Sequence, residues 1–299
     1  MKGSERTLEK LVVKPGEPAH LDRRDPGWDG DAKSKKRADA HARELLASSV
    51  VELEEAQARL WSSDRYAVLV IFQALDAAGK DGTIRHVMSG VNPQGVEVTS
   101  FKQPSPEELS HDFLWRAAKA LPQRGRIAIF NRSYYEEVLA VRVHPEWLER
   151  QHLGDGPFAD AFWRQRFESI NAFERHLHRN GTTVVKLFLH VSKDEQRRRL
   201  LARLDDPAKV WKFSADDVAE RAHWEEYMSA FEEAITATST DWAPWFVIPA
   251  DDKPLMRALV AAVIVDAIDS LKLRAPEVSA DQRAANERAR RELEAQKPG

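Results

Sequence analysis

Residues 66–72 form a short apolar run with several β-branched side chains, which is typical of a strand buried in a parallel sheet. A turn of small residues follows at 74–79, and a helical pattern begins at the Gly79-Lys80 pair. Such a strand, turn, Gly-Lys pair and helix start make a Walker-type loop, whose backbone N–H groups and helix dipole hold phosphates. We therefore expect this segment to bind phosphates, with Lys80 bridging them. The residues expected to contact a nucleotide here are Ala77, Ala78, Gly79, Gly82 and Thr83.

The loop departs from the common Walker pattern at two positions. Ala74 replaces the first glycine, and Asp81 replaces the Ser or Thr that usually follows the lysine. On the pattern alone, a plain strand-to-helix turn is therefore an alternative. Asp76 is the informative residue, because a carboxylate inside a loop built for anions repels the ligand unless a cation stands between them. We predict that Asp76 binds Mg²⁺, with Mn²⁺ as a second option; the simpler interpretation is that Asp76 makes an Asx turn.

Strand and helix signals alternate along the rest of the chain. Apolar runs at 66–72, 96–101, 126–130, 182–190 and 244–248 predict five strands, and helical patterns follow from 79, 106, 158, 192 and 252. The alternation predicts an α/β fold with a parallel five-stranded sheet and helices on both faces. Residues 1–60 are predicted to form an arm, irregular at 14–37, and an entry helix from 38. The polar tail at 276–299 is predicted to be a loosely held helix.

Composition narrows the class of protein. At 299 residues the chain is close to what one hydrophobic core supports, and we expect one main domain at 61–275. The chain has no cysteine, which excludes disulfides, thiolate catalysis and thiolate metal sites. A secretory pattern and a long apolar span are both missing, so we expect a cytoplasmic protein that does not bind a membrane. The net charge of −3 gives no general attraction for nucleic acid, so anions must be bound by local clusters.

Polar and charged side chains follow the third predicted strand, at Asn131, Arg132, Glu136 and Glu137. In doubly wound α/β folds the ligand crevice lies outside the carboxyl ends of the strands. This segment should therefore face the loop around Lys80, and the two should share one cleft.

Four stretches together resemble the polyphosphate kinase 2 family. They lie at 72–84 (FQALDAAGKDGTI), at 91–95 (VNPQG), at 130–135 (FNRSYY), and at 193–197 (KDEQR) with 206–212 (DPAKVWK). The stretches span most of residues 60–250 in the family's order, and this combination is specific where each piece alone is not. The resemblance implies a P-loop kinase fold like that of thymidylate kinase, with a helical lid. It also implies inorganic polyphosphate as the phosphoryl donor, adenosine nucleotides as acceptors, and a homo-oligomer.

The resemblance assigns roles to individual residues. Asp76 corresponds to the family's essential metal-binding or catalytic aspartate, Lys80 to the phosphate-loop lysine, and Arg132 to the arginine that follows the second acidic position. Many members have aspartate where this chain has Asn131. The asparagine form, with the glutamate pair that starts at Glu136, resembles the subgroup that phosphorylates both AMP and ADP.

The exchange at Asn131 has a physical interpretation. A neutral amide coordinates or hydrogen-bonds without adding negative charge to a polyanionic site. Glu136 would then supply a carboxylate to a second metal, so we expect Asp76, Asn131 and Glu136 to be the metal ligands. In the alternative interpretation, Glu136 and Glu137 are solvated residues in the first turn of a helix, favoured there by the helix dipole.

Residues 193–212 carry seven cations against four acids in a chain of negative net charge. We expect this segment to belong to a basic lid at about 193–225 that binds polyphosphate. The alternative is a solvated helix face, in which acids pair with arginines one turn later. Arg197 lies on a leucine face, where an unpaired guanidinium needs an anion, and Arg199 and Arg203 are one turn apart and could clamp successive phosphates. The expected polyphosphate-binding residues are Lys80, Arg197, Arg198, Arg199, Arg203, Lys209 and Lys212.

For the acceptor nucleotide, we expect Arg132 and Arg142 to hold the α-phosphate. Phe101 or Tyr134 would flank the base, although Phe101 fits a core position equally well. Phosphoryl transfer needs positioning and charge neutralisation and no nucleophilic side chain. The expected catalytic set is therefore Asp76, Lys80, Asn131, Arg132 and Glu136.

Two other functions fit parts of the sequence. An ATP-dependent nucleoside monophosphate kinase of the same fold predicts a Ser or Thr after the lysine, where this chain has Asp81. A non-catalytic phosphate-sensing or nucleic-acid-binding module has no need of Asp76. Nucleic-acid readers also interleave aromatic with basic residues, and the predicted lid tip offers Trp211 for this purpose.

Overall fold

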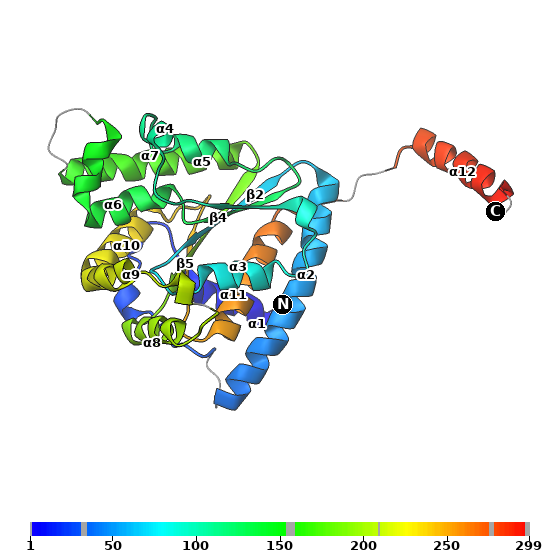
Figure 1. The fold of residues 1–299 in the computed structure, drawn as a ribbon. Coiled ribbons are helices and arrows are strands. Elements are labelled where there is room, and N and C mark those ends of the chain that lie inside the picture. The colour runs from blue at the N-terminus through cyan, green and yellow to red at the C-terminus, as the bar shows by residue number, and fades with distance from the viewer. Residues whose placement is uncertain (1, 31–34, 154–158, 209, 275–277, 297–299) are drawn as a thin grey trace.

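The sheet has six strands, in the order β1-β6-β5-β2-β4-β3. The computed structural model describes the chain except residues 1, 31–34, 154–158, 209, 275–277 and 297–299 (Figure 1). The five predicted strands are all present, and their neighbours in the sheet run parallel. They are β2 (Ala67–Gln73), β3 (Val96–Ser100), β4 (Ile127–Asn131), β5 (Thr182–His190) and β6 (Trp245–Pro249).

The prediction of a five-stranded, fully parallel sheet is wrong at one edge. A short strand, β1 (Val12–Val13), pairs antiparallel with β6. Two residues are too few to show a period in the sequence, and β1 follows directly on helix α1 (Lys2–Leu11). The pairing with β6 is a tertiary contact across most of the chain, which local patterns do not reveal.

The sheet separates two hydrophobic cores, and β2 contributes to both. Val68, Val70 and Phe72 face one core, while Leu69 and Ile71 face the other, as the alternation of side chains along a strand requires. Every residue of β2 is buried. Because a strand covered on both faces has no solvent side, it appears in the sequence as a continuous apolar run.

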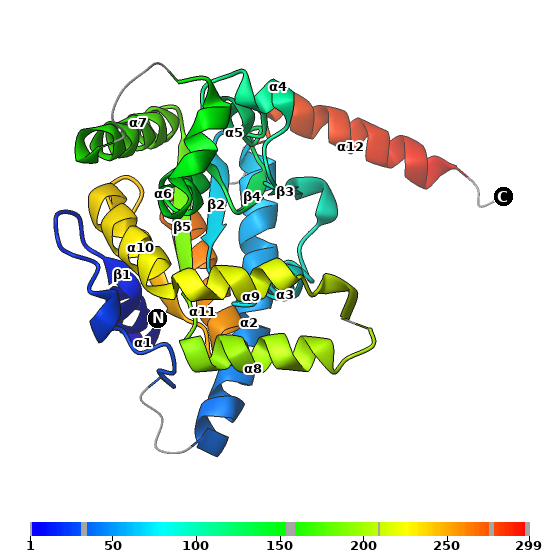
Figure 2. The same ribbon diagram turned by 60° about the vertical axis from the view of Figure 1, so that its left-hand side comes forward.

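Helices cover both faces of the sheet (Figures 1 and 2). The first core lies under α1, α2 (Lys35–Ser63), α3 (Lys80–Val87) and α11 (Lys253–Asp269). The second lies under α5 (Trp115–Lys119), α7 (Asp160–Arg179) and α10 (Trp224–Thr238), together with the 3-10 turn at Tyr134–Val138. The five parallel strands and their helices are consistent with a P-loop kinase fold.

The helix predicted from 106 to 120 is two helices, α4 (Pro106–Leu109) and α5. The capping box that predicted its start is present, because Ser105 accepts from the Glu108 backbone N–H and Glu108 accepts from that of Ser105. Ser110 and Asp112 interrupt the helix, since their side chains bond to nearby backbone groups instead. Between α5 and α7 lie α6 (Ala140–Val143) and a 3-10 turn at Pro145–Gln151.

The predicted lid segment, residues 193–225, consists of short helices on the edge of the sheet that carries the phosphate loop. It begins with α8 (Lys193–Leu204), passes through a 3-10 turn at Val210–Lys212 and α9 (Ala215–Glu220), and leads into α10. Figure 2 shows α8 and α9 running side by side. They carry residues that reach back to the phosphate loop, as described below.

The C-terminal tail forms a helix, α12 (Ala280–Ala295), that buries none of its residues. In Figure 1 it lies away from the other helices and the sheet. A helix that is polar all round gains little by packing on a core, which agrees with the prediction from its sequence. Across the described part of the chain, no helix is both long and apolar enough to cross a membrane.

Candidate active site

The loop between β2 and α3 has the backbone that phosphate binding needs. Ala77 and Gly79 have left-handed φ angles of 59° and 112°, which turn successive N–H groups toward the start of α3. The positive φ is what favours glycine at Gly79, since a Cβ there would make only ordinary contacts, 3.4 Å from the Met256 side chain and 3.6 Å from an Arg199 nitrogen. The lysine that follows, Lys80, is buried and donates from Nζ to the carbonyl oxygen of Ala74 at 2.8 Å.

Burial changes the protonation of this lysine. It lowers the pKa of Lys80 from its ordinary 10.5 to about 8, and the nearby Arg132 charge adds to the effect. Asp76, Glu136 and Asp81 act in the opposite direction. A phosphate anion brought to Lys80 would favour the ammonium form, so ligand binding and protonation of this side chain are coupled.

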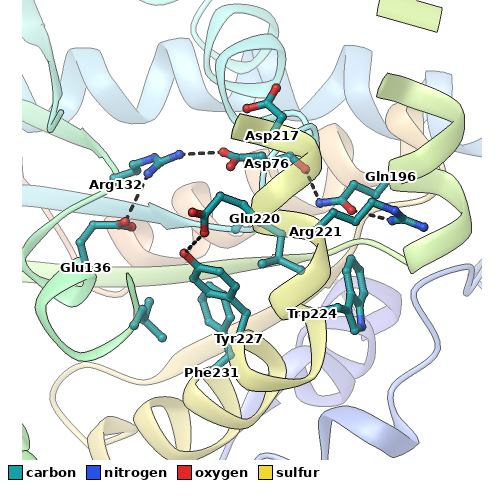
Figure 3. Close-up of a pocket in the computed structure, with 13 residues that line it drawn as sticks. Asp76, Arg132, Glu136, Gln196, Asp217, Glu220, Arg221, Trp224, Tyr227 and Phe231 are labelled. Carbon is teal, nitrogen blue, oxygen red and sulfur yellow. Dashed lines mark hydrogen bonds and ion pairs between the residues drawn. The ribbon is translucent and has the colours of Figure 1, made fainter. Parts of the chain in front are cut away.

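Arg132 connects the phosphate loop after β2 to the segment that follows β4. It follows β4 directly in a left-handed conformation, φ 63°, and its backbone N–H donates to the Phe72 carbonyl at the end of β2. Its guanidinium lies between two carboxylates, with Nη2 2.7 Å from Asp76 Oδ1 and Nη1 3.3 Å from Glu136 Oε2 (Figure 3). The two carboxylates outweigh the effect of burial and raise the pKa of Arg132, with Glu136 making the largest contribution. Arg132 is therefore a permanent positive charge beside the loop.

The lid segment and α10 close this site from the other side. Asp76, Arg132 and Glu136 line a pocket with Gln196, Asp217, Glu220, Arg221, Trp224, Tyr227 and Phe231 (Figure 3). Gln196 of α8 donates to the Asp76 carbonyl at 3.0 Å, and Arg221 donates to the Gln196 side chain at 2.7 Å. The phosphate loop is thus tied to the lid by a chain of hydrogen bonds.

The pocket holds more negative than positive side chains. Burial, and then the charge of Asp76, raise the pKa of Asp217. The pKa of Tyr227 is raised by burial and by Glu220, whose Oε2 accepts a hydrogen bond from its hydroxyl at 2.6 Å. Carboxylates that repel one another in this way favour a bound cation.

The proposed metal ligands do not converge on one point by themselves. Asp76 and Glu136 flank Arg132, while Asn131 donates from Nδ2 to Asp81 Oδ1 at 2.8 Å. Within the described ranges, no three His, Asp or Glu side chains lie close enough together to hold a metal ion. This is compatible with Mg²⁺, which takes one or two carboxylates together with water and substrate phosphates instead of a complete protein cage.

The structure contradicts the expected roles of four residues, and for Phe101 it confirms the alternative of a core position. Phe101 and Tyr134 are buried in the second core and cannot flank a base, and Phe101 packs edge-on against Phe130. Arg142 pairs with Glu233 at 2.6 Å and does not line the pocket. Glu137, weighed as a solvated residue, is buried and pairs with two arginines. Its partners are Arg116, at 3.8 Å, and Arg166, at 3.2 Å.

The lid arginines have different surroundings. Arg199 is buried and donates to Glu195 and to the carbonyl oxygens of Ala78 and Ala250, so the expectation that it clamps phosphates together with Arg203 is wrong. Its guanidinium instead ties the phosphate loop to the end of β6. Arg203 pairs with Asp217 at 3.1 Å.

The two other arginines expected to bind polyphosphate, Arg197 and Arg198, lie on the outside of α8. Arg198 is exposed and pairs with Glu195, three residues earlier, at 2.7 Å, and not with Asp194, the partner that a spacing of four residues predicts. Arg197 is exposed. Of the leucines on its side of α8, Leu200 is buried, but Leu201 is 49% exposed and Leu204 is 43% exposed. The argument that Arg197 needs an anion because it is buried therefore fails, but its side chain stays accessible. Lys209 and the side chain of Lys212 lie outside the described residues.

Several pocket residues were missed by the sequence analysis, namely Gln196, Asp217, Glu220, Arg221, Trp224 and Tyr227. Except for Gln196 in α8, they follow the lid tip, where the chain has ordinary helix patterns. One signal was available: three of the five residues at 216–220 and both residues at 225–226 are acidic, and they follow a basic segment. Such a charge reversal fits a lid that closes over a cation as well as an anion.

The fold and the site together define an α/β phosphotransferase class, with a phosphate loop, a carboxylate–arginine pair and a helical lid. The polyphosphate kinase 2 (PPK2) family model matches residues 34–276. The chain belongs to this family.

Named relatives are similar over most of the chain. An ADP-polyphosphate phosphotransferase from Rhodopseudomonas palustris is 55% identical, covering 81% of this chain and 84% of its own. An AMP/ADP-polyphosphate phosphotransferase from Meiothermus ruber is 43% identical, covering 90% and 96%. The crystal structure of polyphosphate kinase 2 from Arthrobacter aurescens is 42% identical with a TM-score of 0.82, covering 93% of this chain and 95% of that one.

Proposed function

We propose that the protein transfers the terminal phosphoryl group of inorganic polyphosphate to an adenosine nucleotide. One observation carries the proposal: the phosphate loop contains a carboxylate, Asp76, held at 2.7 Å by Arg132 from the neighbouring strand end. The family and the names of the relatives supply the donor and the kind of acceptor. The absence of cysteine and the resemblance to the family lead us to propose a cytoplasmic homo-oligomer.

The reaction needs no covalent enzyme intermediate. An oxygen of the acceptor's terminal phosphate bonds to the terminal phosphorus of polyphosphate, while the anhydride P–O bond breaks and its electron pair leaves with the shortened chain. Lys80 and Arg132 neutralise charge on the transferred group and fix its position, which supplies most of the catalysis in phosphoryl transfer. The residues Ala77, Ala78, Gly79, Gly82 and Thr83 would present the loop and the first turn of α3 to phosphate oxygens.

Asp76 and Glu136 would hold Mg²⁺, or Mn²⁺ in its place, with phosphate oxygens completing the shell. The metal would supply charge neutralisation between donor and acceptor. Asn131 lies at the end of β4 and bonds Asp81, which places it beside the loop. We assign it the role of orienting that carboxylate and, with a bound substrate, of a neutral ligand.

The pocket must enlarge before a nucleotide enters. The cavity has a volume of about 40 Å³, whereas binding sites for small molecules have volumes of about 300–1,000 Å³. The residues that narrow it, Gln196, Asp217 and Glu220, belong to the lid segment. We therefore propose that α8 and α9 move away to admit the acceptor and close again for the reaction, as lids commonly do.

We propose AMP and ADP as acceptors. Asn131 supports this choice, because an amide adds no negative charge to the site. The relatives' names point both ways, since one is named for ADP and the other for AMP and ADP.

Product analysis tests the proposal. Purified protein is incubated with Mg²⁺ and long-chain polyphosphate, with AMP in one tube and ADP in another, and nucleotides are separated by chromatography. ADP and then ATP should form from AMP, and ATP should form from ADP. Product from ADP alone would overturn the dual acceptor, and no product in either tube would overturn the proposed function.

A further inference from the structure

His144 contacts the lid from a part of the chain that does not belong to it. It lies between α6 and the 3-10 turn at Pro145–Gln151. Its Nε2 is 3.1 Å from Oε2 of Glu220, the last residue of α9, which follows 76 positions later in the chain. A carboxylate only accepts, so the imidazole is the donor. Because Glu220 lines the candidate active site, this contact joins a residue outside the lid to the wall of the pocket.

The position of His144 is fixed by its own segment. Its backbone N–H donates to the Ala140 carbonyl at 2.9 Å, and its carbonyl accepts from the Trp147 N–H at 3.0 Å. The imidazole stacks on the Trp147 ring, with centroids 4.6 Å apart and planes 17° from parallel. Its Nδ1 lies 3.3 Å from Glu146 Oε1, and the His223 ring packs edge-on against it at 5.2 Å. The helix, the turn and the stacking all lie outside the lid, so His144 provides a fixed point against which α9 can be held.

Glu220 is held at one oxygen by two donors. Besides the bond from His144, its Oε2 accepts from the Tyr227 hydroxyl at 2.6 Å (Figure 3). The side chain of Glu220 is 29% exposed and that of His144 is 16% exposed, so water competes with this contact less than with a surface ion pair. Asp217, the other carboxylate that α9 contributes to the pocket, pairs instead with Arg203 of the lid itself. The Asp217 pair therefore moves with the lid, whereas the bond from His144 resists its movement.

We propose that His144 is a positioning residue that holds Glu220 across the acceptor pocket while the pocket is empty. The proposal rests on the proposed function, which requires a nucleotide to enter there. A cavity of about 40 Å³ cannot contain a nucleotide, so Glu220 must move and its bond to His144 must break before the acceptor binds. The apparent affinity for the acceptor is then reduced by the fraction of protein that is closed. His144 thus sets how readily the empty site opens.

Hydrogen exchange in the protein without ligands tests the contact itself. His144→Phe keeps a ring on Trp147 but removes the donor to Glu220, whereas His144→Gln keeps an N–H donor. Amide exchange over residues 213–223 should be about ten-fold faster in His144→Phe, because lid opening no longer breaks a hydrogen bond to a carboxylate. His144→Gln should exchange at close to the wild-type rate.

Acceptor affinity separates a positioning role from a general loss of structure. Calorimetry with Mg²⁺ and AMP, without polyphosphate, should give a Kd about ten-fold lower in His144→Phe than in the wild type. The KM for AMP should fall with it, while kcat changes by less than about two-fold, because the contact belongs to the empty site. Disruption of the lid would have the opposite effect and weaken AMP binding.

Two further variants complete the test. His111 stacks on Trp115 at 3.8 Å in the same way as His144 on its tryptophan, but it does not line the pocket, so His111→Phe is the matched control. It should leave lid exchange and the Kd for AMP at wild-type values. Glu146 is exposed, so Glu146→Gln keeps the test valid if His144→Phe does not fold. Loss of this partner of the imidazole should lower the Kd for AMP about two-fold.

Lid exchange at the wild-type rate in His144→Phe would overturn the proposal. So would an unchanged or higher Kd for AMP in that variant, or an equal response of His111→Phe. Faster lid exchange in His144→Phe, together with a wild-type protein that forms no product from polyphosphate and AMP, would contradict the proposed function and leave the His144–Glu220 contact standing.

Discussion

At the scale of single residues, Asp76 places a negative charge in a loop that binds anions, where it would repel a phosphate. The carboxylate is accepted because Arg132 binds it at 2.7 Å from the neighbouring strand end. Arg132 reaches it from a left-handed backbone conformation, which a residue with a Cβ adopts at some cost. Strain of this kind is commonly retained where it positions a functional group, and here it directs the guanidinium at Asp76.

Replacing Asp76 with asparagine should abolish transfer without unfolding the protein. The amide keeps the size of the side chain but removes the charge that would hold the metal, and we expect kcat to fall at least about a hundred-fold. Steady-state kinetics and a thermal melt measure the two effects. Asp64→Asn, at the other end of β2, is the control. A fully active Asp76→Asn variant would exclude the metal-binding role.

Lys80 predicts a pH dependence. Its pKa is lowered to about 8, so the free enzyme loses the ammonium group above that pH. The value of kcat/KM for polyphosphate should therefore fall above about pH 8. Lys80→Arg should move this decline to higher pH. A wild-type profile that stays flat through the alkaline range would contradict the assignment.

The same pKa has a consequence for stability. Between about pH 8 and pH 10.5, Lys80 holds more protons in the unfolded chain than in the folded chain, because folding lowers its pKa. The contribution of this group to the free energy of unfolding therefore rises with pH through that window. Activity and this part of the stability change in opposite directions, which separates loss of the ammonium group from unfolding.

At the scale of elements, a buried polar cluster joins α7, β5 and the turn after β4. Glu174 lies 2.6 Å from Lys186 Nζ, and both side chains are fully buried. Tyr134 and Tyr135 donate their hydroxyls to Glu174 at 2.9 and 2.8 Å. This cluster holds the segment that carries Arg132 and Glu136 against the sheet, and it explains why the tyrosines are unavailable to a nucleotide.

Glu174→Ala should lower the free energy of unfolding by about 3–5 kcal/mol, because it leaves the Lys186 charge buried without its partner. Denaturant unfolding at neutral pH measures the loss. The control is Glu168→Ala on the exposed side of the same helix, with an expected change within about 0.5 kcal/mol. Equal stability of the two variants would show that the cluster does not stabilise the fold.

Substitution of the buried Arg199 should affect stability and kcat more than substitution of its exposed neighbour Arg198. Because it donates to carbonyl oxygens of the phosphate loop and of the end of β6, Arg199→Lys should cost about 1–3 kcal/mol of stability and lower kcat as the loop loosens. Arg198→Lys should change neither quantity measurably. If Arg199→Lys weakens polyphosphate binding at unchanged stability, Arg199 contacts the donor directly.

Strands and helix starts could be predicted where a local sequence pattern determines them. The buried runs of β2 and β5, the capping box of α4 and the Ser192 cap of α8 are visible in the sequence because neighbours along the chain determine them. The capping box expected at α8 is incomplete, because the Ser192 backbone N–H donates to Asp251 and not to Glu195. The pairing of β1 with β6 was not predictable, since it depends on residues more than two hundred positions apart. The same applies to the site: Asp76 and Lys80 sit in one loop motif, but Asp217 and Gln196 join it only through the path of the lid.

At the scale of the whole molecule, the described chain consists of a sheet covered by helices, a lid over one edge of the sheet and a C-terminal helix that buries none of its residues. The phosphate loop belongs to the sheet and is tied to the lid through Gln196, which donates to the Asp76 carbonyl. Opening the lid therefore breaks a hydrogen bond to the loop that binds the donor. This geometry links admission of the acceptor to the arrangement of the phosphate site.

The central claim is that polyphosphate, not ATP, is the phosphoryl donor. The most direct test compares initial rates of ADP formation from AMP with polyphosphate and with ATP as donors, at equal phosphoanhydride concentration and with Mg²⁺ present. The account predicts rapid formation with polyphosphate and little with ATP, because Asp81 stands where an ATP-dependent loop has Ser or Thr. A faster reaction with ATP would show that the protein is an ATP-dependent nucleoside monophosphate kinase.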